Sequence, residues 1–196
     1  MLLRTDALCT AEDVINNGGL VQDDNDDNTF IENRINNITA AFNIEVGVNQ
    51  FLTNSFSYDM NGNGLSKMYM TRRYQPLLSI TSIYDDTAWL YPESSLIDSS
   101  DYVIVDGVYI QLLDLVFTCG IQNIRVSGTR GYAATSNEML ALKNQCIIEV
   151  TRTFNRRGTE DVTGITDPHG NVTYIKRGWT EDTKNLLDSL KVLSLY

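Results

Sequence analysis

The sequence contains little of what common catalytic and metal-binding sites require. Its 196 residues include a single histidine, His169, and three cysteines at wide spacing. One histidine is too few for a multi-histidine metal site, and the cysteines fit neither a disulfide framework nor a paired zinc pattern. We therefore expect Cys9, Cys119 and Cys146 to be reduced packing residues. The sequence also has no nucleophile elbow, phosphate-binding loop or dinucleotide fingerprint, so we expect no enzyme, cofactor or metal.

Positive charge and long apolar runs are scarce as well. The chain has 15 Lys and Arg against 25 Asp and Glu, a formal net charge of −10, and most of the excess lies in residues 1–100. Nucleic-acid binding relies on clustered cations, so a stable complex with DNA is disfavoured. No apolar run approaches the roughly 20 residues of a membrane span, and no secretory leader is apparent. We expect a soluble, unsecreted protein without membrane contact.

Two amphipathic helices are predicted near the N-terminus. Thr10 and Asp13 form the pattern of a capping box for a helix over residues 11–17, which Gly18 and Gly19 end. A second helix follows the acidic segment of residues 23–27, which we interpret as its solvated N-terminal entry. Its buried face is marked by apolar residues at three- and four-residue steps: Phe30, Ile31, Ile35, Ile38, Ala41 and Phe42.

From residue 51 onward tyrosines, β-branched residues and turn signals indicate strands. Asn61 to Gly64 predicts a hairpin turn, and Asp106-Gly107 a second tight turn, because Asn, Asp and Gly tolerate positive φ. Residues 85–100 contain Pro92 and paired serines and predict an exposed loop. The strand candidates are residues 78–84, 102–105, 108–113 and 123–127.

Helical periodicity returns after Ser136, which is the predicted N-cap, and Gly158 ends that helix. Its predicted apolar side comprises Leu140, Leu142, Ile147, Val150 and Phe154. Cations in its last turns, Arg152, Arg156 and Arg157, are explained by the helix dipole. A turn at residues 167–170 joins two short extended pieces, and Thr180 caps a final helix. The class is therefore α+β, with N-terminal amphipathic helices, a central antiparallel β region with hairpins, and C-terminal helices packed on it.

Several acidic patterns resemble sites without matching them. Residues 59–64 match the start of a calcium-binding EF-hand loop, but Lys67 and Met70 occupy the positions of later ligands. Residues 24–28 match a calcium-binding loop less well. His169, the single histidine, lies in a predicted turn and is interpreted as a structural residue. The pairs Asp85-Asp86 and 160–161 are adjacent on expected loops, which makes a hydrolase the least favoured alternative. A calcium- or carbohydrate-binding β module remains an alternative function.

The end of the chain is its most distinctive candidate interface. We predict a division into a core of residues 1–158 and a partner-contacting extension of residues 159–196. An apolar terminal helix docks either on its own domain or on a neighbour, and the sequence leaves both open. The candidate partner-contacting residues are Trp179, Leu186, Leu187, Leu190, Leu193 and Tyr196.

Read in order, short motifs over residues 8–158 resemble the head-to-tail connector (adaptor) proteins of tailed bacteriophages. The resemblance rests on element order, on a Thr-Ala-Glu-Asp-Val opening from Thr10, and on the Gly131-Tyr132 corner after an apolar strand. The further matching segments are residues 58–64, 76–83, 101–107 and 124–132, followed by a helix ending in Arg-Arg-Gly.

This resemblance implies a structural protein of the virion neck, assembled in the host cytoplasm. Copies would form a ring, commonly twelve-fold, beneath the portal protein, extending the DNA channel and offering a platform to the next neck or tail protein. Double-stranded DNA would pass through without sequence-specific binding. Another neck component, such as a stopper or tail completion protein, is the nearest alternative. In the family, C-terminal segments commonly reach the portal, which would give the apolar terminal residues a partner.

Overall fold

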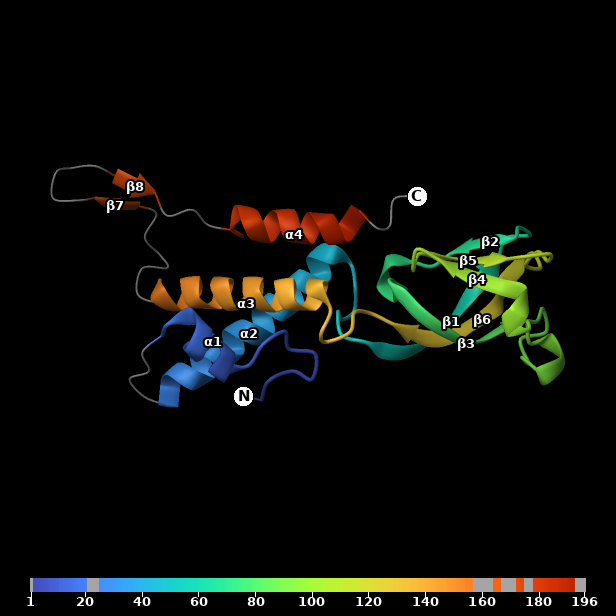
Figure 1. The fold of residues 1–196 in the computed structure, drawn as a ribbon, viewed down its shortest axis with the longest axis horizontal. Coiled ribbons are helices and arrows are strands. Elements are labelled where there is room, and N and C mark those ends of the chain that lie inside the picture. The colour runs from blue at the N-terminus through green and yellow to red at the C-terminus, as the bar shows by residue number, and fades with distance from the viewer. Residues whose placement is uncertain (1, 21–24, 157–163, 167–171, 175–177, 193–196) are drawn as a thin grey trace. The chain divides into compact units, whose positions relative to one another are not determined.

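The chain forms two compact units, each described here by itself. The computed structural model describes residues 2–20, 25–156, 164–166, 172–174 and 178–192 (Figure 1). The helical unit comprises Met1–Glu45 and Leu140–Leu190, and the β unit comprises Val46–Met139 with Lys191–Tyr196. The predicted α+β class is confirmed. The compact units divide the chain at other points than residue 158, and the proposed core and partner-contacting extension stay a prediction.

The first helix begins at the predicted residue and ends one residue beyond its predicted range, at Gly18. α1 (Ala11–Gly18) is capped by Thr10, whose hydroxyl accepts a hydrogen bond from the backbone of Asp13 at 3.1 Å, while the Asp13 carboxylate accepts one from the backbone of Thr10 at 2.9 Å. Gly19 ends the helix in the left-handed conformation, with a φ of 65°. This reciprocal cap satisfies backbone donors that a helix start otherwise leaves open.

α2 (Asn25–Val46) buries the face that the periodicity predicted. Ile31, Ile35 and Phe42 are fully buried in the helical unit, and Ile38 is nearly so. Asp27 near the helix start is also buried, with 4% of its surface exposed, so the prediction of a solvated entry is wrong for this residue. Residues 23 and 24 of the acidic segment lie outside the described residues.

α3 (Asn137–Asn155) starts at its predicted cap, where Ser136 accepts a hydrogen bond from the backbone of Met139 at 3.2 Å. Its buried side consists of Met139, Leu142, Cys146, Ile147, Val150 and Phe154. Leu140 was assigned to this side incorrectly, since 49% of its surface is exposed. Residues two apart on a helix point in very different directions, so Leu140 and Leu142 cannot share one face. Arg157 and Gly158 lie outside the described residues.

The β unit contains two antiparallel sheets that share a hydrophobic core. One sheet has the order β1 (Asn54–Gly62), β6 (Gly120–Arg130), β3 (Leu77–Asp85). The other has the order β2 (Lys67–Tyr69), β5 (Tyr109–Leu112), β4 (Tyr102–Val105). Short 3-10 turns lie between strands: η1 (Arg72–Tyr74), η2 (Glu93–Ser95) and η3 (Ser99–Asp101). Both sheets contribute fully buried residues to the core, among them Ile83, Ile110 and Ile124. The predicted strands are therefore confirmed, and β6 extends beyond its predicted ends.

One of the two predicted hairpin turns is confirmed and the other is wrong. Asp106 and Gly107 join the paired strands β4 and β5, with φ values of 53° and 66°. Asn61 to Gly64 does not form a hairpin, because β1 pairs with β6 and β2 pairs with β5. This turn instead carries the chain from one sheet to the other. Gly62 is needed there, since an added Cβ would lie 1.7 Å from the carbonyl oxygen of Thr118.

The remaining elements agree with the predictions in outline. β7 (Gly164–Thr166) and β8 (Val172–Tyr174) pair antiparallel, as expected for the two extended pieces, and the turn containing His169 lies outside the described residues. Cys9 and Cys146 are buried free thiols with their sulfur atoms 3.6 Å apart, whereas Cys119 is exposed and is therefore not a packing residue. No helix in the described part of the chain has the length and hydropathy of a membrane span.

Candidate functional site

The final helix is the centre of the predicted interface, and its start is confirmed. α4 (Glu181–Val192) follows Thr180, whose side chain accepts a hydrogen bond from the backbone of Thr183 at 3.3 Å. Thr183, Leu187 and Leu190 lie on one helical face and are buried, with Thr183 fully enclosed. This face of α4 is therefore already packed within the helical unit of the free chain.

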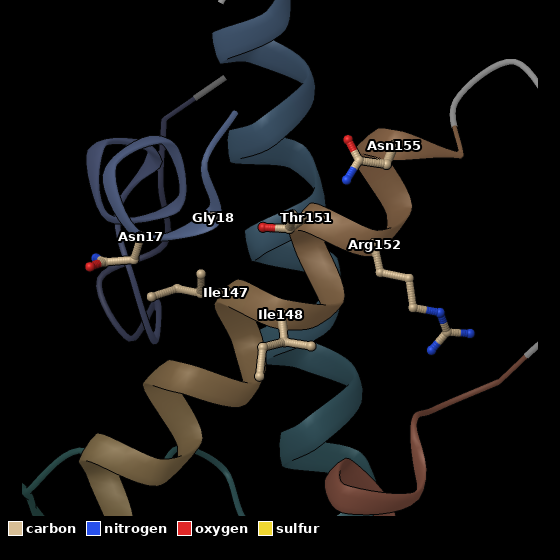
Figure 2. Close-up of a pocket in the computed structure, with 7 residues that line it drawn as sticks. All are labelled: Asn17, Gly18, Ile147, Ile148, Thr151, Arg152 and Asn155. Carbon is tan, nitrogen blue, oxygen red and sulfur yellow. The ribbon is translucent and has the colours of Figure 1, made fainter. Parts of the chain in front are cut away.

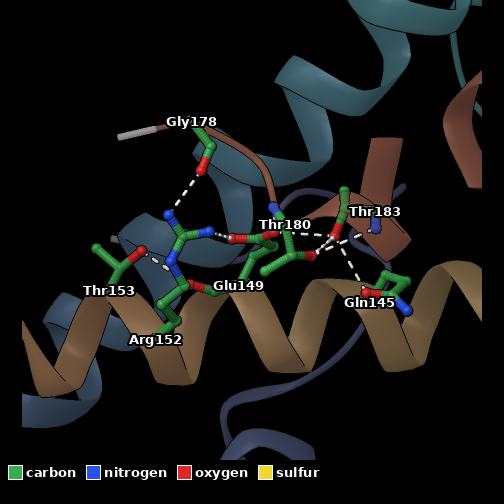
Figure 3. Close-up of polar contacts among 7 residues, drawn as sticks. All are labelled: Gln145, Glu149, Arg152, Thr153, Gly178, Thr180 and Thr183. Atoms are coloured by element: carbon green, nitrogen blue, oxygen red, sulfur yellow. Dashed lines mark hydrogen bonds and ion pairs between the residues drawn. The ribbon is translucent and has the colours of Figure 1, made fainter. Parts of the chain in front are cut away.

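A buried carboxylate on α3 holds the beginning of α4 (Figure 3). Oε1 of Glu149 accepts hydrogen bonds from the backbone nitrogen of Thr180 at 2.7 Å and from the hydroxyl of Thr183 at 2.8 Å. The same hydroxyl lies 3.1 Å from Oε1 of Gln145. The side chain of Glu149 is only 5% exposed, so these bonds replace the water that a buried carboxylate loses.

Arg152 completes this polar cluster from the other side. Its guanidinium donates to Oε2 of Glu149 at 2.8 Å and to the carbonyl oxygen of Gly178 at 2.6 Å, so it contacts both α3 and the segment before α4 (Figure 3). The sequence-based explanation of Arg152 by the helix dipole therefore missed its specific partners. Glu149 was missed altogether. Its signal is a carboxylate seven residues after Leu142, on the apolar stripe of α3.

Trp179 lies against α2 rather than standing free in solvent. Its ring meets Phe42 edge to face, with centroids 5.1 Å apart, and it is half-buried. It lines a shallow pocket of about 220 Å³ together with Glu45, Lys184, Leu187 and Asp188. Of the predicted partner residues, Leu187 and Leu190 are buried, Trp179 and Leu186 are half-buried, and Leu193 and Tyr196 lie outside the described residues.

A second, larger groove lies between α1 and α3 (Figure 2). It has a volume of about 320 Å³ and is lined by Asn17, Gly18, Ile147, Ile148, Thr151, Arg152 and Asn155. The helices approach closely at Gly18, where an added Cβ would lie 2.3 Å from Oγ1 of Thr151. Ile148 is 47% exposed at this groove. Apolar side chains, amides and an ion-paired arginine line it, which suits it to protein contact better than to bond chemistry.

The side chains that resembled a calcium loop have partners within the protein. Both carboxylate oxygens of Asp59 accept hydrogen bonds from Arg125, at 2.7 and 2.8 Å, and this pairing lowers the pKa of Asp59. Oδ1 of Asn61 accepts from the backbone of Gln122, and Oδ1 of Asn63 from that of Leu65. Among the described residues, no group of three or more His, Cys, Asp or Glu is placed to hold a metal ion.

The adjacent carboxylates Asp85 and Asp86 also have structural partners. Asp85 accepts hydrogen bonds from the backbone of Thr118 at 2.7 Å and from the amide of Asn123 at 3.2 Å. Asp86 accepts three from the backbone of its own loop, and these bonds lower its pKa, led by the one from Ala88. The pair at residues 160–161 lies outside the described residues. Asp85 and Asp86 therefore organise loops.

Comparison with known proteins decides the fold. No protein-family model matches this sequence, and no curated protein is significantly similar to it. A chain in the neck of an empty GTA particle, computed with C6 symmetry, aligns over 100% of this chain and 94% of its own, with a TM-score of 0.59 and 11% identity. This chain has the fold of a particle-neck protein.

The same neck fold recurs in two further solved structures. A chain of the neck of a native GTA particle, computed with C12 symmetry, gives a TM-score of 0.54 at 12% identity and is covered to 97%. A chain of the virion of a native gene transfer agent particle gives 0.53 at 12% identity and is covered to 94%. The resemblance to neck proteins inferred from the sequence is confirmed at the level of the fold.

Proposed function

We propose that this chain is a structural subunit of the neck of a phage-like particle and acts through assembly rather than catalysis. The supporting observation is that its full length aligns with nearly the full length of chains from neck assemblies of six-fold and twelve-fold symmetry. A likeness that includes both units and the C-terminal helix supports a shared mode of assembly. The proposed product is a ring of identical copies, twelve in the virion.

Within that neck we propose the role of head-to-tail connector. The ring lies beneath the portal protein, continues the DNA channel and presents a platform to the next neck or tail protein. The net charge of −10 supports a channel wall that repels phosphate, through which DNA moves without being held. Assembly onto the particle takes place in the host cytoplasm.

The proposed portal contact uses the exposed side of α4. Leu187 and Leu190 pack inside the helical unit, so the surface proposed for a partner includes Leu186 of α4 and Trp179, which precedes the helix. The Glu149 cluster fixes the start of α4, which limits the ordering entropy that binding would otherwise cost. A pre-oriented helix with half-buried apolar residues suits docking on a neighbouring protein.

The test is location in the particle. Antibodies against this chain, with gold labelling and negative-stain microscopy of purified particles, should mark the junction of head and tail. Label at the tail side of the neck would favour a stopper or tail completion protein, and absence of the chain from particles would refute the proposal. For the portal contact, Leu186→Glu should weaken binding to the portal at least tenfold, while Asn185→Glu, an exposed neighbour, should not.

A further inference from the structure

Two features of opposite charge lie at the two ends of β3. The turn η1, with Arg72 and Arg73, immediately precedes the strand, and the acidic loop of residues 86–101 follows it. β3 contains nine residues, so its ends are about 30 Å apart at the usual rise of an extended strand. Both features belong to the β unit. The β unit therefore carries two arginines before this strand and an acidic loop after it.

The basic feature, which we call the basic turn, consists of Arg72, Arg73 and the underlying Arg130. Arg73 is exposed and Arg72 half-buried, and neither forms an ion pair with any described residue. Arg130 is 2% exposed, donates a hydrogen bond to the carbonyl oxygen of Arg73 and leaves its Nε without a partner in the described structure. Burial lowers the pKa of Arg130, and repulsion from Arg73 adds to this effect.

Arg72, Arg73 and Arg130 are neighbours, and none of them forms an ion pair with a carboxylate of the described residues. By contrast, an Asp or Glu of this chain pairs with each of five other cations: Arg4, Arg125, Lys143, Arg152 and Lys184. An uncompensated cluster of like charges raises the energy of the free chain, and an acidic partner removes that cost. The basic turn is therefore suited to an acidic surface outside its own chain.

The basic turn is held in place by its own contacts. The ring of Tyr74 stacks on Tyr58 with centroids 4.4 Å apart, and it lies beneath the guanidinium of Arg130 at 5.5 Å. The amide of Gln75 donates to the carbonyl oxygen of Met70 at 2.6 Å. The turn thus presents Arg72 and Arg73 from a fixed backbone, which reduces the entropy lost on docking.

The acidic loop at the other end of β3 is equally well fixed. Asp86 accepts the backbone hydrogen bonds of Ala88, Leu90 and Tyr91, and the indole of Trp89 donates to the carbonyl oxygen of Ile121 at 2.8 Å. These contacts display apolar surface, since Trp89 is 61% exposed and Leu90 is 80% exposed. The loop's other acidic residues are Glu93, Asp98 and Asp101.

We propose that, in the neck ring, the acidic loop of one copy docks on the basic turn of the next copy. This inference rests on the proposed ring. Opposite charges at opposite ends of β3 favour a contact between unlike surfaces of two copies over a contact between like surfaces. Such heterologous contacts close into a ring when the rotation between copies is suitable. Surface ion pairs contribute little binding free energy by themselves. The exposed apolar side chains of Trp89 and Leu90 add surface that can be buried in the contact.

Charge reversal in the particle-producing host tests this contact. Arg72→Glu/Arg73→Glu and Glu93→Lys/Asp101→Lys should each lower the amount of this chain per purified particle at least tenfold, measured by quantitative mass spectrometry. The quadruple variant combines all four substitutions and so exchanges the charges of both surfaces; it should restore incorporation. Lys67→Glu reverses another exposed cation of the same unit; it is the control for charge reversal and should be incorporated normally. Unchanged melting temperatures of the purified variants verify folding.

The outcomes separate this inference from the proposed function. Absence of the unaltered chain from particles refutes the neck assignment. If the unaltered chain is present and the arginine variant is incorporated normally, only the proposed contact is overturned. The contact is also overturned if the quadruple variant folds but is not incorporated. Normal incorporation of the arginine variant with loss of packaged DNA would instead assign Arg72 and Arg73 to phosphate contact.

Discussion

Oε1 of Glu149 lies 2.7 Å from the backbone nitrogen of Thr180 and thereby joins the middle of α3 to the first residue before α4. The two residues are 31 positions apart, and the segment between them includes a described β pair, β7 and β8. A single buried carboxylate therefore holds the start of α4 on α3. The hydroxyl of Thr183, which also donates to Glu149, lies on the same buried face of α4 as Leu187 and Leu190.

Removal of the Glu149 carboxylate should detach α4 from α3. Glu149→Ala leaves Thr180, Thr183 and Arg152 without their shared acceptor, and we expect a loss of about 2–4 kcal/mol in the free energy of unfolding. Urea denaturation measures this loss, and limited proteolysis should release the C-terminal segment. Glu181→Ala changes an exposed carboxylate and should cost less than about 0.5 kcal/mol. Equal stability of the two variants would contradict the assigned role.

Stability should fall in acid partly through Asp6. Hydrogen bonds from the Arg4 guanidinium lower the pKa of Asp6 below its ordinary 3.8, and the amide of Asn43 donates to it as well. A lowered pKa in the folded state contributes stability that is complete above about pH 4 and disappears as the pH falls through the folded value. Arg4 is 42% exposed and screened by solvent, so this contribution is at most about 1 kcal/mol.

Urea unfolding between pH 7 and pH 3 isolates this effect by comparison with Asp6→Asn. The substitution removes the titrating group, so the two stability curves should lie apart at pH 7 and converge in acid. Other carboxylates, such as Asp59, titrate in both proteins and cancel in the difference. Curves that stay parallel over the whole range would show that Asp6 does not report the Arg4 interaction.

Two neighbouring glycines should respond differently to alanine. At Gly62 an added Cβ would lie 1.7 Å from the carbonyl oxygen of Thr118, so Gly62→Ala must displace backbone and should cost about 3 kcal/mol or more. Gly64 has room, with the nearest atom 3.8 Å away, but its φ of +73° disfavours a side chain and predicts a cost of about 1 kcal/mol. Thermal unfolding distinguishes the two, and a reversed order would contradict the close approach.

The three thiols should differ sharply in reactivity. Cys119 is exposed and should react with an aromatic disulfide reagent within minutes at pH 8, whereas Cys9 and Cys146 are buried. A hydrogen bond with Cys9, together with burial, raises the pKa of Cys146 well above its ordinary value, which lowers its thiolate content further. One equivalent should react in the native protein and three after denaturation. Rapid reaction of all three in the native state would contradict the buried position of Cys9 and Cys146.

The limits of sequence-based prediction are clearest in the β unit. The strand β6 pairs with β1 and β3, and its register joins Asn54 to Arg130 across 76 positions. Local patterns identify strands through alternation and turn residues, but they carry no information about partners so distant. Asn61 to Gly64 illustrates this, because its turn chemistry is compatible both with a hairpin and with the passage between sheets that the structure contains.

What the sequence determined by itself was local: the caps Thr10, Ser136 and Thr180, the buried faces of α2 and α3 in outline, and the tight turn at Asp106 and Gly107. These features depend on residues within one or two turns of each other, where hydrogen-bond geometry leaves few alternatives. Tertiary structure alone decided that Glu149 receives Thr180, that Leu187 is buried, and that Arg73 and Arg130 lie together. Those contacts depend on the packing of distant segments, which local pattern does not encode.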